Sequence, residues 1–304
     1  MTRFLTIAAL VASVVMMSPG DALAADDWRA EQARQIAIVH RAVERYRDVE
    51  VAKADGWTFR GAVAPLMGEH WSRADQPVPV AGEPIDFSRP ANLMYTDIGG
   101  RMELVGVAFL VRLGDFDPLP EGFAGPEDVW HVHNLDQILG AVKESHPLVA
   151  WFGRRWIDNS FAPDGRRRLA MVHLWLDGRS ADSPFADRDR ALAYRRAGLP
   201  NGSWYGHSMD AAFGIAIAHP DGCDEELDGK LWLSGANWIK RRKTRRACKA
   251  AAEMVRAHLT ASSDQLARQA EIAWAGFQTD MSQILSAEEQ QRIASLVEAG
   301  CGGN

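Results

Sequence analysis

Two histidines separated by one residue are the first feature of this sequence that could do chemistry. His131 and His133 lie in the segment VWHVHNL, residues 129–135. Alternate side chains of a β-strand point to the same face, so both imidazoles would share one face, with Trp130 and Val132 on the other. Two imidazoles about 7 Å apart along a strand can converge on one metal ion. The spacing therefore predicts a metal site, with a polar edge strand as the alternative.

Two further histidines lie in the same part of the chain. His173 is in AMVHLWL, which we expect to be a strand, and His70 follows PLMGE in what we expect to be a loop. A buried neutral imidazole needs partners for both ring nitrogens, so several in one apolar region are best explained by a shared ligand. We expect His131, His133 and His173 to bind a metal ion, with His70 as the fourth ligand. Taken singly, each could instead be a structural histidine.

Carboxylates adjoin these histidines in the sequence. Glu69 directly precedes His70, and Asp136 follows His133 by three residues. A carboxylate often holds the second nitrogen of a metal-bound imidazole. We expect Glu69 or Asp136 to do this or to act as a general base.

The ligand types narrow the choice of ion. No cysteine lies near the histidines, which excludes a thiolate zinc site. Imidazole suits both copper and zinc, whereas thioether sulfur favours copper. Because Met67 and Met171 are close to the histidines, we place copper slightly ahead of zinc, although methionine at such positions also serves as ordinary core filler.

The first 24 residues have the pattern of a secretory signal peptide. Arg3 is followed by an apolar stretch over residues 4–17, and Ala22 and Ala24 fit a small-x-small cleavage site. We expect cleavage near Ala24 and a periplasmic or secreted protein. That compartment permits disulfides.

The cysteines and the change of sequence texture suggest how the exported chain is organised. We expect Cys223 to pair with Cys248, because Cys301 lies in a glycine-rich tail. We divide the chain into a helix-plus-β region over residues 25–199, which would hold the metal, and a mainly helical region over residues 200–304.

The fold class that these patterns predict is α+β. One helix over residues 27–54 would precede a β-rich antiparallel region that extends to about residue 176, and the C-terminal third would be helical. Ile98 to Gly100 would form a hairpin turn, and KLWLSG, residues 230–235, is a further strand candidate. The main expected strands are GWTFRGA, ANLMYTD, RMELVGVAFLV, DVWHVH and RLAMVHLWL.

The net charge gives no reason to expect nucleic acid as a partner, and export argues against it for the one basic run. The net charge is −6, and the basic run KRRKTRRACK over residues 240–249 is best explained as a solvated helix face. An acidic protein or a lipid headgroup is the alternative partner for that run. No stretch after the signal peptide has the length of a membrane-spanning helix, so we expect a protein that does not cross the membrane.

Several segments, in order, resemble a family of exported bacterial proteins of uncharacterised function. They are KADGW, LMGEHW, PANLMYTDIGGRMELVGVAFLV, WHVHNL and MVHLWL, and together they cover roughly residues 50–190. The resemblance implies that the histidines belong together but names no reaction. This sequence departs from the family pattern at Ala108, where the resemblance leads us to expect Glu.

Three functions fit the sequence. The first is an exported metal-binding protein for storage, sensing or delivery. The second is a metal-dependent oxidoreductase or hydrolase that uses the same histidines and leaves one coordination position open. The third is an envelope interaction protein without metal, in which the helical C-terminal region binds a protein partner.

Overall fold

A computed structural model describes most of the chain after the signal segment. The described residues are 19–59, 67–76, 78–143, 145–177, 183–189, 192, 195, 222–258 and 263–300. Most of the predicted signal peptide and the predicted boundary between residues 199 and 200 lie outside these ranges.

The N-terminal segment is helical but not one continuous helix. Helix α1 spans Pro19–Val43, the 3-10 helix η1 spans Glu44–Arg47, and helix α2 spans Val49–Ala54. The prediction of one helix over residues 27–54 is therefore wrong at its start and in its middle. The break follows from Asp48, whose extended backbone and side chain cap α2 by accepting a hydrogen bond from the Glu50 amide.

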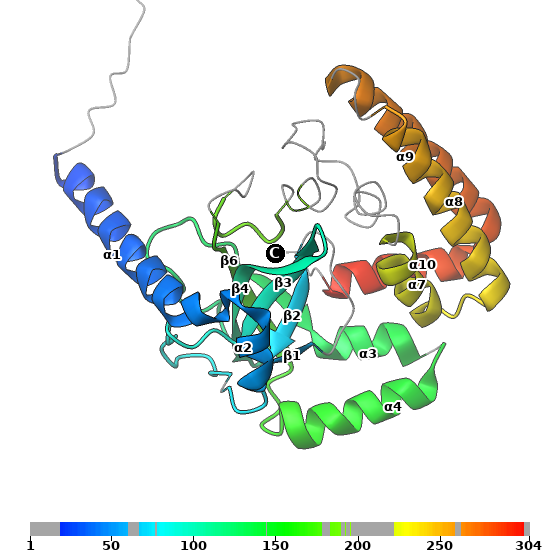
Figure 1. Cartoon of the computed structure of the whole chain (residues 1–304). Helices are drawn as coiled ribbons and strands as arrows, with labels where there is room; N and C mark the ends of the chain where they lie inside the picture. The colour runs from blue at the N-terminus through cyan, green and yellow to red at the C-terminus, as the bar shows by residue number, and fades with distance from the viewer. Residues whose placement is uncertain are drawn as a thin grey trace, which may run out of the picture.

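A six-stranded antiparallel sheet forms the centre of the molecule (Figure 1). The strand order is β1-β2-β3-β4-β6-β5, and every neighbouring pair is antiparallel. The predicted α+β class, with a helix before the sheet and helices after it, is confirmed. The strands are β1 Thr58–Phe59, β2 Glu69–Ser72, β3 Asn92–Ile98, β4 Arg101–Leu113, β5 His131–Asn134 and β6 Arg168–Trp175.

Two local features set the register of the central hairpin. Gly99 and Gly100 form the two-residue turn between β3 and β4, with φ values of 62° and 83°, so the predicted hairpin is confirmed. Farther along, Tyr95 pairs with Leu104 while Met94 pairs with Gly106, which leaves Val105 as a bulge. The bulge shifts the alternation of β4, so that Leu104 and Val107 both face the main core.

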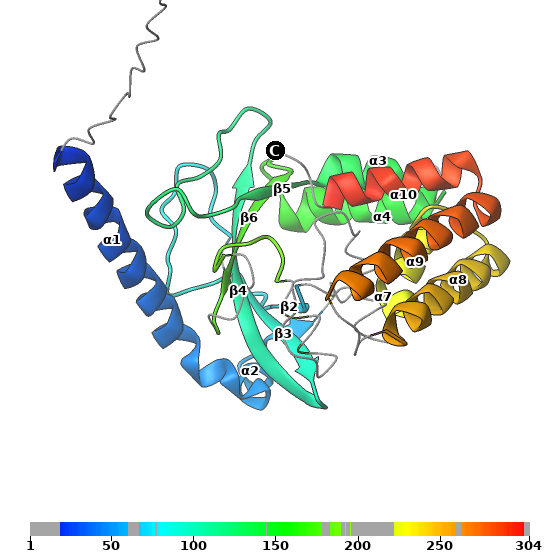
Figure 2. The ribbon, with the colours of Figure 1, turned by 90° about the horizontal axis from the view of Figure 1, so that it is seen from above.

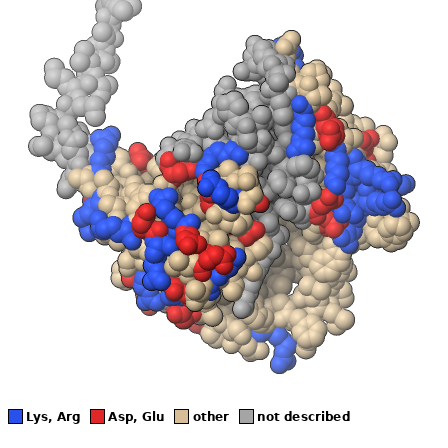
Figure 3. All heavy atoms as spheres, viewed as in Figure 1, with Lys and Arg blue, Asp and Glu red and all other residues tan. Residues whose placement is uncertain are grey.

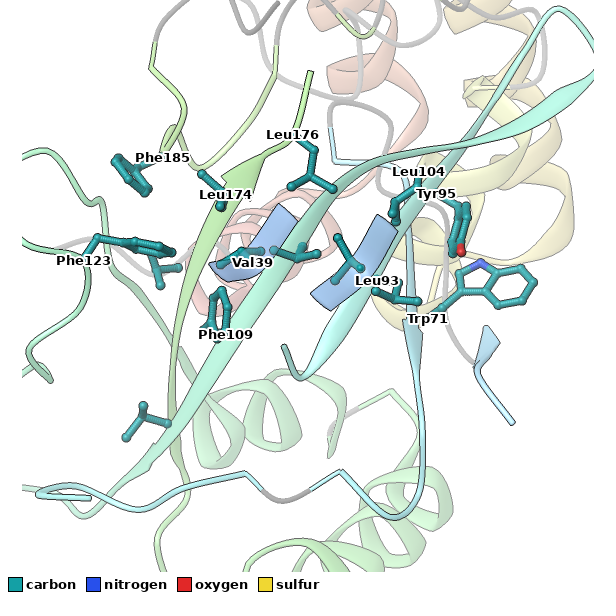
Figure 4. Close-up of a cluster of buried hydrophobic side chains, with 14 of the residues drawn as sticks. Val39, Trp71, Leu93, Tyr95, Leu104, Phe109, Phe123, Leu174, Leu176 and Phe185 are labelled. Carbon is teal, nitrogen blue, oxygen red and sulfur yellow. The ribbon is translucent and has the colours of Figure 1, made fainter. Parts of the chain in front are cut away.

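One face of the sheet packs against the N-terminal helices and forms the main core. Val39 and Val43 of α1 lie in the same buried cluster as Leu93 of β3 and Phe109 of β4. Aromatic side chains from loops and strands extend this cluster along the sheet (Figure 4). The sheet therefore gains most of its hydrophobic stabilisation from this side.

The opposite face carries a smaller apolar cluster and the predicted histidines. Met94 of β3, Ala108 of β4 and Trp175 of β6 are buried there, with Met171 packed against them. We call this side of the sheet the histidine face.

The helices that come after β5 in the chain gather on the side away from α1 (Figure 2). Helix α10 packs against α3, α7 and β5, and α8 packs against α7 and α9. No helix in the described ranges is long and apolar enough to cross a membrane. The helices are α3 Leu135–Lys143, α4 Pro147–Trp156, the π-helical turn η2 Ile157–Phe161, α7 Gly222–Leu233, α8 Trp238–Arg256, α9 Ser263–Ile284 and α10 Ala287–Gly300.

The structure joins Cys223 to Cys248, as the sequence predicts, with their Cα atoms 5.9 Å apart. This disulfide ties the start of α7 to the middle of α8. The strand expected over residues 230–235 is wrong, because Lys230 to Leu233 form the last turn of α7. The Leu and Trp residues at 231–233 also suit a helix that packs against α8 and α10.

Gly68 precedes β2 at a point where the chain approaches its neighbour closely. Its φ is +74°, and an added Cβ would lie 2.3 Å from the Tyr95 carbonyl oxygen. We predict that Gly68→Ala lowers the free energy of unfolding by clearly more than the 1–2 kcal/mol or so that a left-handed alanine costs. Gly165→Ala is the matched control, because its φ is +81° with no atom within 4 Å of the added Cβ. Equal losses in urea unfolding would contradict this prediction.

Candidate histidine site

All four predicted histidines lie on strands and face the same side of the sheet. His131 and His133 are on β5, His173 is on β6, and His70 is on β2. The expectation that His70 lies in a loop is therefore wrong. The alternation within β5 is as predicted, since Val132 packs with the main core on the opposite face.

The rings form a continuous cluster across this face. The ring centroids of His70 and His173 are 5.4 Å apart, those of His173 and His131 5.0 Å, and those of His131 and His133 5.0 Å. We call these four residues the histidine cluster. The structure thus brings together the side chains that the sequence grouped.

The contact between His70 and His173 requires a concave sheet. Strands β3 and β4 lie between β2 and β6, which would place the two histidines about 14 Å apart on a flat sheet. Their Nε2 atoms are nevertheless 3.4 Å apart. The small side chains of β4 leave room for this approach, because Ala108 pairs with His173 and Gly106 lies two residues before it. An added Cβ on Gly106 would lie 3.2 Å from the Trp175 ring.

The hydrogen bonds of His173 determine which nitrogen carries its proton. Its Nδ1 lies 2.8 Å from the Asp187 backbone carbonyl oxygen, which can only accept, so Nδ1 donates. In the neutral ring, Nε2 therefore carries a lone pair. That lone pair faces His70 Nε2, and it also lies 3.2 Å from the thioether sulfur of Met171.

His70 lies beside this lone pair, with its Nε2 at hydrogen-bond distance, 3.4 Å from His173 Nε2. A backbone contact with Gly68 opposes the effect of burial on the His70 pKa. In the metal-free protein, a proton on His70 Nε2 can be donated to the lone pair of His173. When that proton is on His70 Nδ1 instead, both Nε2 lone pairs are open to a cation.

The His131 side chain lacks hydrogen-bond partners for its two ring nitrogens within the described ranges. It is 8% exposed, and both of its ring nitrogens are buried without a hydrogen-bond partner among the described residues. A buried polar group left in this state costs about 1–3 kcal/mol. Such a cost is expected where the group serves a ligand rather than the fold.

Burial keeps His70, His131 and His173 neutral at ordinary pH. It lowers the pKa of His70 to about 4, with help from the nearby His133. It lowers the pKa of His131 to about 3, with further contributions from His133, His70 and Arg188. Burial, followed by the proximity of His70 and His131, also brings the pKa of His173 well below its usual value. Neutral imidazole is the form that binds metal ions.

Neither predicted carboxylate is placed to assist the histidines. Glu69 points to the opposite face of β2, where it accepts a hydrogen bond of 2.7 Å from the Trp71 indole. Asp136 accepts a bond of 2.5 Å from Arg154 and lies 3.7 Å from Arg167. The support for His173 comes instead from the Asp187 backbone, which a side-chain pattern could not reveal.

The cluster does not form a complete coordination sphere as it stands. In the described part of the chain, no group of three or more His, Cys, Asp or Glu side chains is arranged to hold a metal ion. His70 and His173 already face each other, whereas the rings of His131 and His133 would have to turn toward them.

The basic run occupies α8, and part of it is neutralised within the fold. Arg241 pairs with Asp228, and Arg245 and Lys249 pair with Asp224, all across the contact with α7. Arg242, Lys243 and Arg246 are exposed. Basic side chains accordingly gather at the right edge of the molecule in Figure 3.

The chain matches no known protein family, no curated protein and no solved structure. The resemblance to exported bacterial proteins therefore stays a prediction.

The low pKa values predict a particular acid sensitivity for the metal-free protein. Unfolding returns each histidine to a pKa near 6.5, so below this pH the unfolded chain binds more protons than the folded chain. We expect the free energy of unfolding to fall as the pH decreases from about 6.5 through about 4, with the loss from His131 continuing to about 3. Each histidine contributes a slope of up to about 1.4 kcal/mol per pH unit.

Urea unfolding of metal-free protein across this range measures the slope. His131→Leu should make it shallower, because it removes one of the histidines whose pKa burial lowers. An unchanged slope in His131→Leu would contradict the prediction.

Proposed function

We propose that this is an exported metal-binding protein whose histidine cluster holds a transition-metal ion, with copper favoured over zinc. The observation that carries the proposal is the pair of Nε2 atoms of His70 and His173, 3.4 Å apart, with His131 beside them lacking a partner for either ring nitrogen among the described residues. His131 or His133 would supply further nitrogens by turning toward this pair.

The separation of the two nitrogens matches that of ligands on a common ion. Metal–nitrogen bonds of about 2.0–2.1 Å at a tetrahedral angle place two imidazole nitrogens about 3.3–3.4 Å apart. The backbone carbonyl of Asp187 holds Nδ1 of His173, as is usual for metal-bound histidines. A purely structural role would explain the contact between His70 and His173 as an N–H···N hydrogen bond, but it would leave both nitrogens of His131 buried without a partner among the described residues.

Met171 supports copper over zinc. Its sulfur lies 3.2 Å from His173 Nε2, on the side of the ring that bears the lone pair. Thioether sulfur is a soft ligand that selects Cu(I), whereas zinc is seldom bound by methionine.

The neighbourhood of the cluster supports binding more than catalysis. A metal-dependent hydrolase needs a general base near the ion, and the two carboxylates considered for that role are engaged elsewhere. Storage, sensing or delivery of the ion requires only the ligands.

His131→Leu tests the proposal most directly. Leucine removes two buried nitrogens that lack partners in the described structure, so the metal-free variant should be at least as stable as the wild type. It should also lose affinity for copper by at least about a hundredfold, since outer-shell changes alone cost 10–100-fold. Competition with a chromophoric chelator measures the affinity, and urea unfolding measures the stability.

His258→Gln, outside the cluster, should change neither property. Failure of the wild type to take up stoichiometric copper or zinc on reconstitution would overturn the proposal. Destabilisation of His131→Leu without any change in metal affinity would identify the histidine as structural.

Met171→Leu separates copper from zinc. The substitution nearly conserves side-chain volume, so it should cost less than about 1.5 kcal/mol of stability. We expect the affinity for Cu(I) to fall by at least about tenfold while that for Zn(II) is unchanged. Equal losses for both ions, or no loss for Cu(I), would contradict the assignment of Met171 as a ligand.

A further inference from the structure

Helix α4 presents an apolar face to solvent. Leu148, Trp151, Phe152 and Trp156 follow the three- and four-residue spacing of one helical face, and each is between 52% and 71% exposed. Large apolar side chains gathered in this way mark a binding surface. We call these four residues, with Arg155 among them, the outer face of α4.

The aromatic side chains of this surface are ordered by contacts with one another. Trp151 and Phe152 meet edge to face with centroids 4.8 Å apart, and Trp156 stacks on Phe161 of the following turn at 5.4 Å. Arg155 lies over the Trp151 ring, 5.3 Å from its centroid. The surface is therefore preorganised, which lowers the entropy cost of binding.

The charge of this surface is positive. Helix α4 contains no acidic residue, and its last turn holds Arg154 and Arg155. Arg154 is paired with Asp136, but no described residue forms an ion pair with Arg155. Figure 3 shows a broad area with few charged side chains at the lower right of the molecule, over α3 and α4, with basic side chains at its lower edge.

We propose that the outer face of α4 docks on an anionic phospholipid surface. Tryptophan favours the boundary between headgroups and acyl chains, and a basic helix with an exposed apolar face lies in the plane of that boundary. With ten residues, α4 is about 15 Å long and is too short to cross a bilayer whose apolar core is about 30 Å thick. The helix would therefore lie along the surface of the bilayer. Arg155 would pair with lipid phosphate.

A second copy of the chain fits this surface less well. A two-fold contact places the same patch on both partners, which would bring two Arg155 guanidinium groups together on a face without carboxylates. An anionic headgroup supplies the missing negative charge. This inference is independent of the metal site.

Flotation of the mature protein with vesicles tests the proposal. Vesicles of phosphatidylcholine mixed with phosphatidylglycerol should carry the wild type upward, and pure phosphatidylcholine vesicles should carry less of it. Trp151→Ser combined with Phe152→Ser should lower the partition coefficient for the mixed vesicles by at least about tenfold. Arg155→Gln should lower it about fivefold for the mixed vesicles only.

Ile272→Ser is the control, because Ile272 is an exposed apolar residue of α9, a helix that lies far from α4 in Figure 1, and it should bind as the wild type does. Circular dichroism and urea unfolding verify that the α4 variants remain folded. The proposal is overturned if the folded wild type binds neither kind of vesicle, or if the α4 variants bind as well as the wild type. Self-association that depends on Trp151 and Phe152, or capture of an acidic protein without vesicle binding, would also overturn it.

Discussion

The hydrogen bond from His173 Nδ1 to the Asp187 carbonyl oxygen determines the chemistry available on the histidine face. By holding the proton on Nδ1, it leaves a lone pair on Nε2, directed at His70 and near the sulfur of Met171. Because the ring is completely buried, water cannot pair with that lone pair. His70 Nε2 is placed to donate a proton to that lone pair in the metal-free protein, and a bound metal ion would take the place of that proton.

The two faces of the sheet have different energetic roles. The face covered by α1 is a conventional hydrophobic core, in which Val39 of the helix packs with Phe109 and Leu174 of the strands. The histidine face buries nitrogens that oppose folding. Hydrophobic burial on the other side of the sheet offsets the free-energy cost of burying these nitrogens. The bulge at Val105 determines which residues of β4 face each side.

Much of this arrangement was predictable from the two-residue alternation of the strands and from the residues of the turns. The alternation in AMVHLWL and VWHVHNL puts the histidines on one face, and the two glycines after Ile98 define the hairpin. The strand around His70 was not predictable, because β2 has only four residues and is preceded by a glycine that suggests a loop. The break before α2 was not predictable, because apolar residues continue at helical spacing on both sides of Asp48.

The residues of the candidate site were predictable, but the contacts that hold them in place were not. Residue types and spacing pointed to the four histidines, and to Met171 as a neighbour. The concavity that joins β2 to β6 depends on sheet curvature, and the role of Asp187 depends on a backbone carbonyl. The carboxylates failed as partners for a simple reason. Adjacent residues on a strand point to opposite faces, so Glu69 cannot accompany His70, and Asp136 belongs to the next helix.

Ala108 has a consequence for the charge of any ion that the cluster holds. It pairs with His173 in the sheet, at the position where the resemblance to exported bacterial proteins leads us to expect Glu. With alanine there, the four imidazoles and the Met171 thioether are all electrically neutral ligands, so the whole charge of the ion stays in a buried environment. Because the energy of burying a charge scales with its square, a monovalent ion would pay about a quarter of the desolvation penalty of a divalent one. In the proposed complex, a methyl group in place of a carboxylate would thus favour the ion of lower oxidation state.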